Sequence, residues 1–224
     1  MSAGGAKGEV RVEEPSTAER TVARRAAEAR ATVPELELAV DADAGACLEL
    51  QARRGASITA ILARACALSL REHPRANGSY RDGHFELYSR VNIGIVVAAE
   101  ETYLIPTVFD ADEKPLEALS EEIEELTAGA SEGRLSSSAF SGATFTLWDA
   151  GVHGVGSANI PAVPPQSAAI AAGAIREVPA LRAGELVADA SMTVTLTCDH
   201  RILYGAGAAA FLVAVKSRLE QTAG

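Results

Sequence analysis

Aromatic residues are scarce in this chain. Among 224 residues there are one Trp, four Tyr and five Phe, although 48% of the residues are hydrophobic. A core of this composition must be built mainly from Ala, Val, Leu and Ile. Basic residues are also few: 20 Lys and Arg face 30 Asp and Glu, which gives a formal net charge of −10. Binding to nucleic acid is driven by positive charge, so we expect no nucleic-acid partner.

Cysteine is rare and long apolar runs are missing. Cys47, Cys66 and Cys198 are an odd number, widely spaced and without a Cys-x-x-Cys pair, which argues against a disulfide scaffold and a zinc site. None of the four histidines lies four residues from another, so we expect no metal. No run reaches the roughly 20 apolar residues that span a bilayer, and the N-terminus lacks the apolar segment of a signal peptide. We therefore expect a cytoplasmic protein with no membrane partner.

Helical and strand patterns alternate along the chain. Ser16 and Glu19 have capping-box spacing and predict a helix that ends by Ala31, before Pro34. Further helices are expected from Ser57 to before Pro74, from Pro115 through Leu126, and over 206–219. Strands are expected at 36–40, 91–97, 103–109, 144–148, 168–174 and 192–197, with turns at 77–78, 82–83 and 100–102. The pattern predicts one α+β domain over residues 16–224, after a flexible tail of residues 1–15.

A charged cluster, Asp199-His200-Arg201, follows the last expected strand. Histidine titrates near neutral pH, and the end of a strand is a place from which a side chain can face a cleft, so His200 is a candidate for proton transfer. The alternative is a structural histidine paired with Asp199.

Several segments resemble the catalytic domain of the dihydrolipoamide acyltransferases of 2-oxoacid dehydrogenase complexes, over about residues 20–220. Asp199-His200-Arg201 with Gly205 resembles the family signature DHRxxDG. The other segments that carry the resemblance are Arg20–Arg25, Val33-Pro34, Val91–Ala98, Leu104–Val108, Gly142–Thr146 and Pro164–Gln166. The resemblance implies a chloramphenicol acetyltransferase-like fold, with a mixed β-sheet flanked by helices.

The resemblance also implies residue roles. His200 is expected to be the general base that deprotonates an acceptor, which then attacks an acyl thioester. The family places Asp or Asn where this chain has Tyr204, and Ser-Asn where it has Trp148 and Asp149. A Tyr hydroxyl and an indole N–H are both donors, so Tyr204 is expected in catalysis, and Trp148 and Asp149 in the oxyanion site or pocket. Which of Trp148 and Tyr204 supplies the oxyanion donor stays open. Asp199, Arg201 and Gly205 are expected to support the loop.

Because no lipoyl domain precedes residue 20 and the hydrophobic tail that links trimers into cubic cores is missing, we expect a free-standing enzyme with no large cubic core. The resemblance implies a homotrimer with the site between subunits; if Tyr204 is the donor, a monomer is the alternative. No bound cofactor is expected, with acetyl-CoA as co-substrate and a small-molecule hydroxyl as acceptor.

Among free-standing relatives, those of tetronate and spirotetronate polyketide pathways fit best. The primary hypothesis is therefore an acetyl-CoA-dependent O-acetyltransferase of antibiotic biosynthesis, which acetylates a tetronate hydroxyl before acetate is eliminated. Two alternatives remain: a dihydrolipoamide acyltransferase core of a 2-oxoacid dehydrogenase complex, and a non-catalytic homologue.

Overall fold

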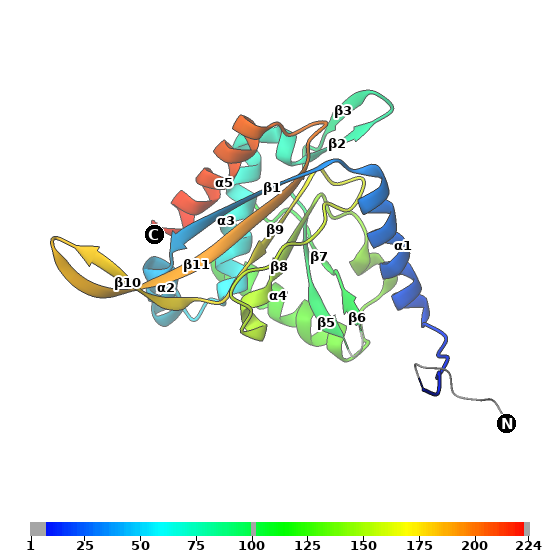
Figure 1. Ribbon diagram of the computed structural model, residues 1–224, viewed down its shortest axis with the longest axis horizontal. Coiled ribbons are helices and arrows are strands. Elements are labelled where there is room, and N and C mark those ends of the chain that lie inside the picture. Colours follow the sequence, from blue (N-terminus) through cyan, green and yellow to red (C-terminus); the bar gives the residue numbers. More distant parts are fainter. Residues whose placement is uncertain (1–7, 100–101, 222–224) are drawn as a thin grey trace.

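The computed structural model describes residues 8–99 and 102–221 (Figure 1). Residues 1–7 of the expected tail, and 100–101 of the expected turn, lie outside the described residues. The helices are α1 (Thr17–Thr32), α2 (Gly45–Arg54), α3 (Ile58–Glu72), α4 (Leu116–Ser131) and α5 (Gly205–Leu219), with 3₁₀ turns η1 (Pro74–Ala76), η2 (Ser137–Phe140) and η3 (Ala150–His153). The strands are β1 (Glu35–Asp43), β2 (Gly78–Arg81), β3 (His84–Leu87), β4 (Ile93–Ile95), β5 (Val97–Ala99), β6 (Thr102–Leu104), β7 (Thr107–Val108), β8 (Phe145–Asp149), β9 (Ala168–Ala172), β10 (Arg176–Arg182) and β11 (Glu185–Asp199).

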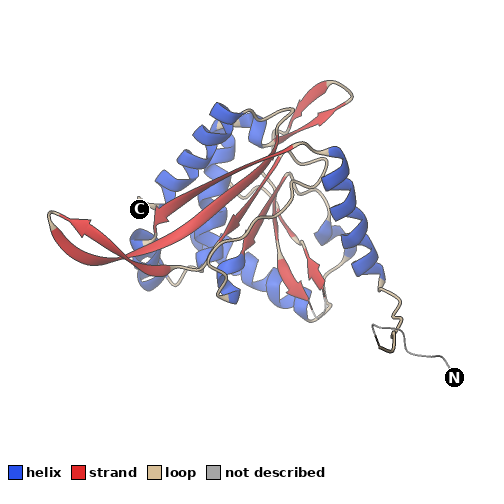
Figure 2. Cartoon of the chain, in the orientation of Figure 1, coloured by secondary structure: helices blue, strands red, loops and turns tan. Residues whose placement is uncertain are grey.

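A mixed seven-stranded sheet forms the centre of the fold (Figure 2). Its order is β1-β11-β9-β8-β4-β7, and β10 pairs with β11 outside this path. β8 runs parallel to both β4 and β9, whereas β11 runs antiparallel to β1, β9 and β10. β9 and β8 therefore begin at the end of the sheet where β11 stops. Side chains at the end of β11 can therefore lie near those at the beginning of β8 and β9, and not near those at the end of β8.

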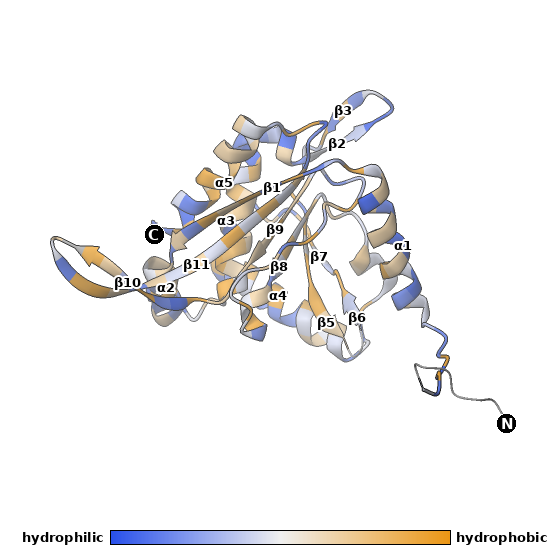
Figure 3. Ribbon diagram, in the orientation of Figure 1, coloured by the Kyte–Doolittle hydropathy of each residue, from blue (hydrophilic) through white to orange (hydrophobic). Residues whose placement is uncertain are grey.

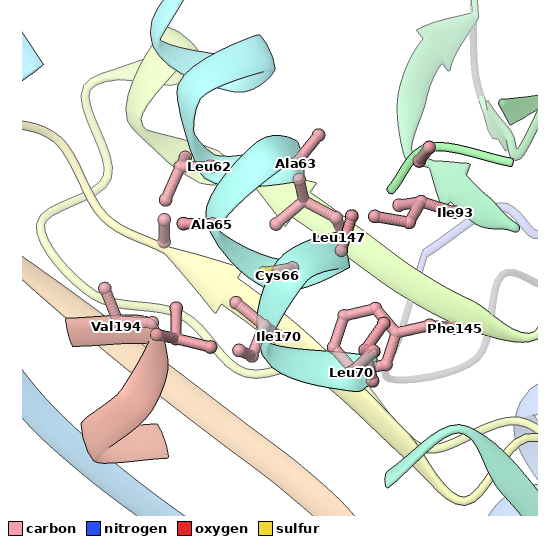
Figure 4. Close-up of a cluster of buried hydrophobic side chains, with 14 of the residues drawn as sticks. Leu62, Ala63, Ala65, Cys66, Leu70, Ile93, Phe145, Leu147, Ile170 and Val194 are labelled. Atoms are coloured by element: carbon pink, nitrogen blue, oxygen red, sulfur yellow. The ribbon is translucent and has the colours of Figure 1, made fainter. Parts of the chain in front are cut away.

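Helices α2–α5 cover one face of this sheet, as expected for an α+β domain (Figure 1). The apolar side of α3 packs onto inward-facing residues of β4, β8, β9 and β11 (Figure 4). Phe145 and Phe211 are fully buried and meet edge to face, with ring centroids 5.9 Å apart. Ala, Val, Leu and Ile make up most of the core, as the composition predicts. Orange apolar segments accordingly gather on α3, α5 and the central strands (Figure 3).

Local signals located several elements correctly. The Ser16–Glu19 capping box forms at the start of α1: the Glu19 N–H donates to the Ser16 hydroxyl at 3.2 Å, and the Glu19 carboxylate accepts from the Ser16 N–H. Asp82 and Gly83 both have positive φ, 51° and 81°, which suits the tight turn between β2 and β3. Pro115 is the N-cap of α4, so the helix begins at Leu116, one residue after the predicted first helical position.

Other elements differ from the predictions. The strand expected over 91–97 is divided into β4 and β5, because β5 leaves the main sheet to pair with β6. The strand expected over 103–109 is interrupted near Pro106, which has no N–H to donate. α2 was not predicted, and its N-cap Ala44 has no side-chain hydrogen bond to mark the start. β10 was also missed, and β11 begins at Glu185, well before the predicted residue 192. Together they form an arm that projects from the sheet (Figure 1).

Candidate active site

His200 is the first residue after β11. Its backbone N–H donates to the Pro34 carbonyl oxygen at 3.0 Å, which ties the turn to the start of β1. The N–H groups of Ile202 and Leu203 donate to the Asp199 carbonyl oxygen at 3.1 and 3.0 Å. Backbone hydrogen bonds therefore fix this turn while the His200 side chain stays exposed. An exposed imidazole on a fixed turn can exchange a proton with a bound molecule.

Asp199 and Arg201 form an ion pair that closes the turn. The Asp199 carboxylate accepts from the Arg201 backbone N–H at 2.9 Å and from Nε and Nη2 at 2.9 and 2.7 Å. The Asp199 side chain is 4% exposed and that of Arg201 34%. This hydrogen bonding to Asp199 raises the pKa of Arg201. Among the described residues the Asp199 carboxylate bonds to Arg201 and not to the His200 ring, which argues against the structural His200–Asp199 pair.

Tyr204 lies beside His200, at the N-cap of α5. The two rings meet edge to face, with centroids 6.2 Å apart. The Tyr204 hydroxyl donates to the Arg201 carbonyl oxygen at 3.2 Å, so it already has a partner within the turn. Gly205 is the first residue of α5, and a Cβ added there would meet no atom within 4 Å of the described chain. The packing within one described chain therefore gives no steric reason for a glycine at this position.

Trp148 and Asp149 end β8 and lie far from His200 within one chain. Through the strand pairing, Trp148 aligns with Ala171 on β9, and Ala171 aligns with Thr195 on β11. Five residues along β11 and two strand spacings separate the positions, or about 17 Å and about 10 Å. The structure therefore brings Asp199, His200, Arg201, Tyr204 and Gly205 together and places Trp148 and Asp149 elsewhere.

Trp148 and Asp149 also point to opposite faces of the sheet, as neighbours on a strand must. The buried Asp149 carboxylate accepts from the Thr59 hydroxyl at 2.8 Å and from the Gly151 N–H at 3.0 Å, so it anchors α3 and the η3 turn. Trp148 packs on the other face with an apolar cluster that includes Ile160 and Val96. The contacts of Asp149 are those of a structural residue. Trp148 lies on the face of the sheet opposite to α3.

A cavity of about 850 Å³ lies between α1, β6 and the beginning of β8. Apolar side chains and a few polar groups line it, among them Arg25, Tyr103, Thr146 and Gln166. The Thr146 hydroxyl donates to the Gln166 side-chain oxygen at 2.7 Å, and the next residue, Ser167, accepts the Asp199 N–H at 2.8 Å through its carbonyl oxygen. This part of the cavity therefore lies at the same end of the sheet as His200. Its lining was not predicted, although the 142–146 and 164–166 segments carried the family resemblance.

Three more side chains near His200 were missed by sequence reasoning. Arg75 precedes the β2–β3 hairpin, and Tyr80 and Phe85 lie on it. The Arg75 guanidinium carbon is 4.9 Å from the Phe85 ring centroid and 5.6 Å from that of Tyr204, and the Arg201 guanidinium carbon is 4.8 Å from that of Tyr80. Three of the ten aromatic residues thus gather around one turn. The scarcity of aromatics was the available signal.

The cysteines lie outside this chemistry. All three are free and buried, and burial raises the pKa of Cys198, next to Asp199, to about 12. A thiol of this kind stays protonated and inert at neutral pH. Among the side chains that the structure describes, no cluster of three or more His, Cys, Asp or Glu could hold a metal. No helix within the described ranges has the length and apolar character that crossing a membrane requires.

Residues 7–224 match the family described as 2-oxoacid dehydrogenases acyltransferase (catalytic domain). The chain belongs to this family. A dihydrolipoyllysine-residue acetyltransferase component of the pyruvate dehydrogenase complex from Zymomonas mobilis is 31% identical over 218 residues, which cover 93% of this chain and 50% of the relative. The chain spans about half the length of the curated relatives it matches. The acyltransferase class predicted from Asp199-His200-Arg201 is confirmed at the level of the family.

Solved structures give the same result for the fold. A probable dihydrolipoamide acetyltransferase from Listeria monocytogenes has a TM-score of 0.89 and 25% identity, and 97% of each chain is covered. The cubic core of a pyruvate dehydrogenase multienzyme complex has a TM-score of 0.88 and 26% identity, over 96% of this chain and 94% of the other. A chloramphenicol acetyltransferase aligns over 88% of this chain and 94% of the other, with a TM-score of 0.57 and 15% identity, which bears on the fold alone. The predicted fold is confirmed.

Two predictions are wrong. The relatives are dihydrolipoyllysine acetyltransferases, which contradicts acetylation of a tetronate hydroxyl and a place in polyketide or antibiotic biosynthesis. The likeness to a cubic core contradicts the expectation of no large cubic core. The substitutions at Trp148 and Tyr204 therefore do not by themselves indicate a different acceptor.

Proposed function

We propose that this domain transfers an acyl group between acyl-CoA and a dihydrolipoyl thiol, with His200 as general base. The observation that carries the proposal is the exposed His200 imidazole on a turn locked by Asp199 and Arg201, in a chain of this acyltransferase family. His200 takes the proton of the dihydrolipoyl thiol, and the thiolate attacks the thioester carbonyl carbon. The tetrahedral oxyanion collapses, the carbon–sulfur bond to CoA breaks, and the CoA thiolate takes the proton back from His200.

The oxyanion needs a preorganised donor. We assign this role to the Trp148 indole N–H, which has no hydrogen bond to another described residue, whereas the Tyr204 hydroxyl is engaged with Arg201. Trp148 and His200 are too far apart to act in one chain, so the site forms between copies, with His200 from one and Trp148 from the next. A homotrimer, as the family resemblance implies, supplies this arrangement.

The acceptor is an apolar arm that ends in a dithiol, and the 850 Å³ cavity is suited to it. Its wall is mostly apolar, and part of it lies at the His200 end of the sheet. Burial raises the pKa of Tyr103 in this wall, so its hydroxyl stays neutral at physiological pH and can donate a hydrogen bond. Acyl-CoA is the co-substrate, and no resident cofactor is required.

One experiment tests the function. The protein is incubated with acetyl-CoA and dihydrolipoamide, and S-acetyl-dihydrolipoamide is measured by mass spectrometry for wild type and for His200→Ala. We expect product with wild type and a loss of about 10²- to 10⁴-fold in the variant. The second candidate, a non-catalytic homologue, is favoured by the packing of Trp148 into an apolar cluster. It predicts no product with either protein, and that result would reject the acyltransferase proposal.

A further inference from the structure

Arg75 occupies an unusual position beside the His200 turn. It lies in η1, just before the β2–β3 hairpin, and the hairpin adjoins the turn between β11 and α5 (Figure 1). Its guanidinium carbon lies over the rings of both Phe85 and Tyr204, within the distance of a cation–π contact. Tyr204 in turn contacts the His200 ring. One aromatic side chain therefore touches both Arg75 and His200.

The N–H donors of Arg75 are free within the described structure. The described residues give its side chain neither a hydrogen bond nor a carboxylate within ion-pair distance, although acidic residues outnumber basic ones. Several other exposed arginines pair with carboxylates, such as Arg81 with Glu86 and Arg90 with Asp110. The side chain is exposed, so these donors face solvent next to the site. The two rings fix the guanidinium in place without using its donors.

We propose that Arg75 binds an anionic oxygen group of a substrate at the His200 site. A planar guanidinium with unused N–H groups is suited to bidentate binding of carboxylate or phosphate, and the aromatic contacts reduce the entropy lost on binding. The inference rests on the proposed function for the identity of the substrates. It makes Arg75 a specificity residue and not a part of the proton transfer.

This anion has two possible sources: a phosphate of acyl-CoA, or a carboxylate on the acceptor. Equilibrium binding separates them, because each anionic ligand has a neutral counterpart. CoA is compared with pantetheine, and dihydrolipoate with dihydrolipoamide, by isothermal titration calorimetry of the wild type, Arg75→Gln and Arg53→Gln. Arg53 is an exposed arginine at the end of α2, and its replacement controls for the loss of one positive charge.

We expect Arg75→Gln to weaken one anionic ligand about tenfold and to leave its neutral counterpart within about twofold, as for the loss of a charged hydrogen bond. If the affinity for CoA falls and that for pantetheine does not change, the anion is a phosphate of CoA. If the affinity for dihydrolipoate falls and that for dihydrolipoamide does not change, the anion is the carboxylate of the acceptor. Unchanged binding of both anions, an equal loss in Arg53→Gln, or no binding to the wild type would overturn the inference.

Circular dichroism and the thermal midpoint of each variant show whether it is folded, and Arg75→Lys provides a second variant. Lys keeps the charge but lacks the planar pair of donors, so we expect it to recover only part of the affinity. Full recovery of the affinity in Arg75→Lys would contradict bidentate binding by the guanidinium. Because binding is measured without turnover, anion binding in a protein that makes no S-acetyl-dihydrolipoamide would support the role of Arg75 while the proposed function fails.

Discussion

The two ends of the central sheet use their polar side chains differently. At the end of β11, a partly buried ion pair between Asp199 and Arg201 locks the turn and leaves the His200 imidazole exposed. At the end of β8, the Asp149 carboxylate accepts hydrogen bonds from Thr59 and Gly151, and Trp148 packs among apolar side chains. One end is arranged to present a titratable group and the other to hold a helix and a loop in place.

His200 and Trp148, both candidates from the family resemblance, thus lie at opposite ends of the sheet within one chain. A neighbouring carboxylate is not evidence of catalysis when its oxygens already have partners, as those of Asp149 do. An exposed imidazole whose neighbouring acid pairs with another residue keeps its own nitrogen atoms available. We therefore assign the proton transfer to the β11 end, and to the β8 end at most a single donor, Trp148.

Replacement of His200 has the largest expected effect. His200→Ala removes the proposed general base, and we expect kcat for S-acetyl-dihydrolipoamide formation to fall by about 10²- to 10⁴-fold. The matched control is His153→Ala, because His153 is an exposed histidine in η3, near the β8 end. A similar fall in both variants would show that the two ends do not differ as described.

Trp148→Phe sharpens the comparison at the other end. Phe keeps an aromatic ring in the cluster but lacks the indole N–H, so we expect kcat to fall by about 10²-fold with little change in KM. Ile160→Val trims the same cluster without removing a donor and is expected to keep nearly full activity. Equal rates for Trp148→Phe and wild type would exclude the indole as the oxyanion donor.

Asp199→Asn tests the lock on the turn. The change leaves the partly buried Arg201 without its charge partner, and we expect the free energy of unfolding to fall by about 1–3 kcal/mol. Urea denaturation monitored by circular dichroism measures this change. Glu132→Gln breaks an exposed pair with Arg134 and is expected to leave stability unchanged. If the two variants unfold alike, the Asp199–Arg201 pair does not stabilise the turn.

Tyr204→Phe is expected to have a small effect. The hydroxyl donates to a carbonyl within the exposed turn, so its loss should lower stability by at most about 1 kcal/mol and kcat by less than about threefold. Steady-state kinetics measure the second quantity. A loss of 10²-fold would instead identify Tyr204 as the oxyanion donor and make a site within one chain possible.

The Cys198 thiol should be unreactive in the native protein. Its pKa of about 12 keeps the thiol protonated at pH 8, and we expect no alkylation by iodoacetamide at that pH, as measured by mass spectrometry. Unfolded thiols ionise near pH 9, whereas the folded one stays protonated, so this group should make the protein less stable as pH rises above about 9. Rapid labelling of Cys198 would add a nucleophile to the β11 end.

Local chemistry explains which parts of the fold could be predicted. The Ser16–Glu19 cap and the Asp82-Gly83 turn depend on residues a few positions apart, so the sequence marks them directly. The arm of β10 and β11 depends on pairing between distant residues, and β10 contains Pro179, which weakens a strand prediction. Whether residues 91–97 form one strand or two is decided by pairing with β6 and β8.

The same reasoning applies to the site. Asp199, His200 and Arg201 are adjacent in the sequence, and their mutual arrangement followed from the motif. A linear motif does not say at which end of a sheet a residue lies, so the separation of Trp148 from His200 needed the register of β8, β9 and β11. The contacts of Arg75 with Phe85 and Tyr204 join distant segments and leave no local pattern.

The most direct test of the account is complementation between copies. His200→Ala and Trp148→Phe chains are co-expressed with different tags, and oligomers that contain both are isolated and assayed for S-acetyl-dihydrolipoamide formation. If His200 of one copy works with Trp148 of the next, some mixed interfaces hold both wild-type residues, and the specific activity should exceed that of either parent. An activity no higher than the average of the two parents would contradict a site shared between copies.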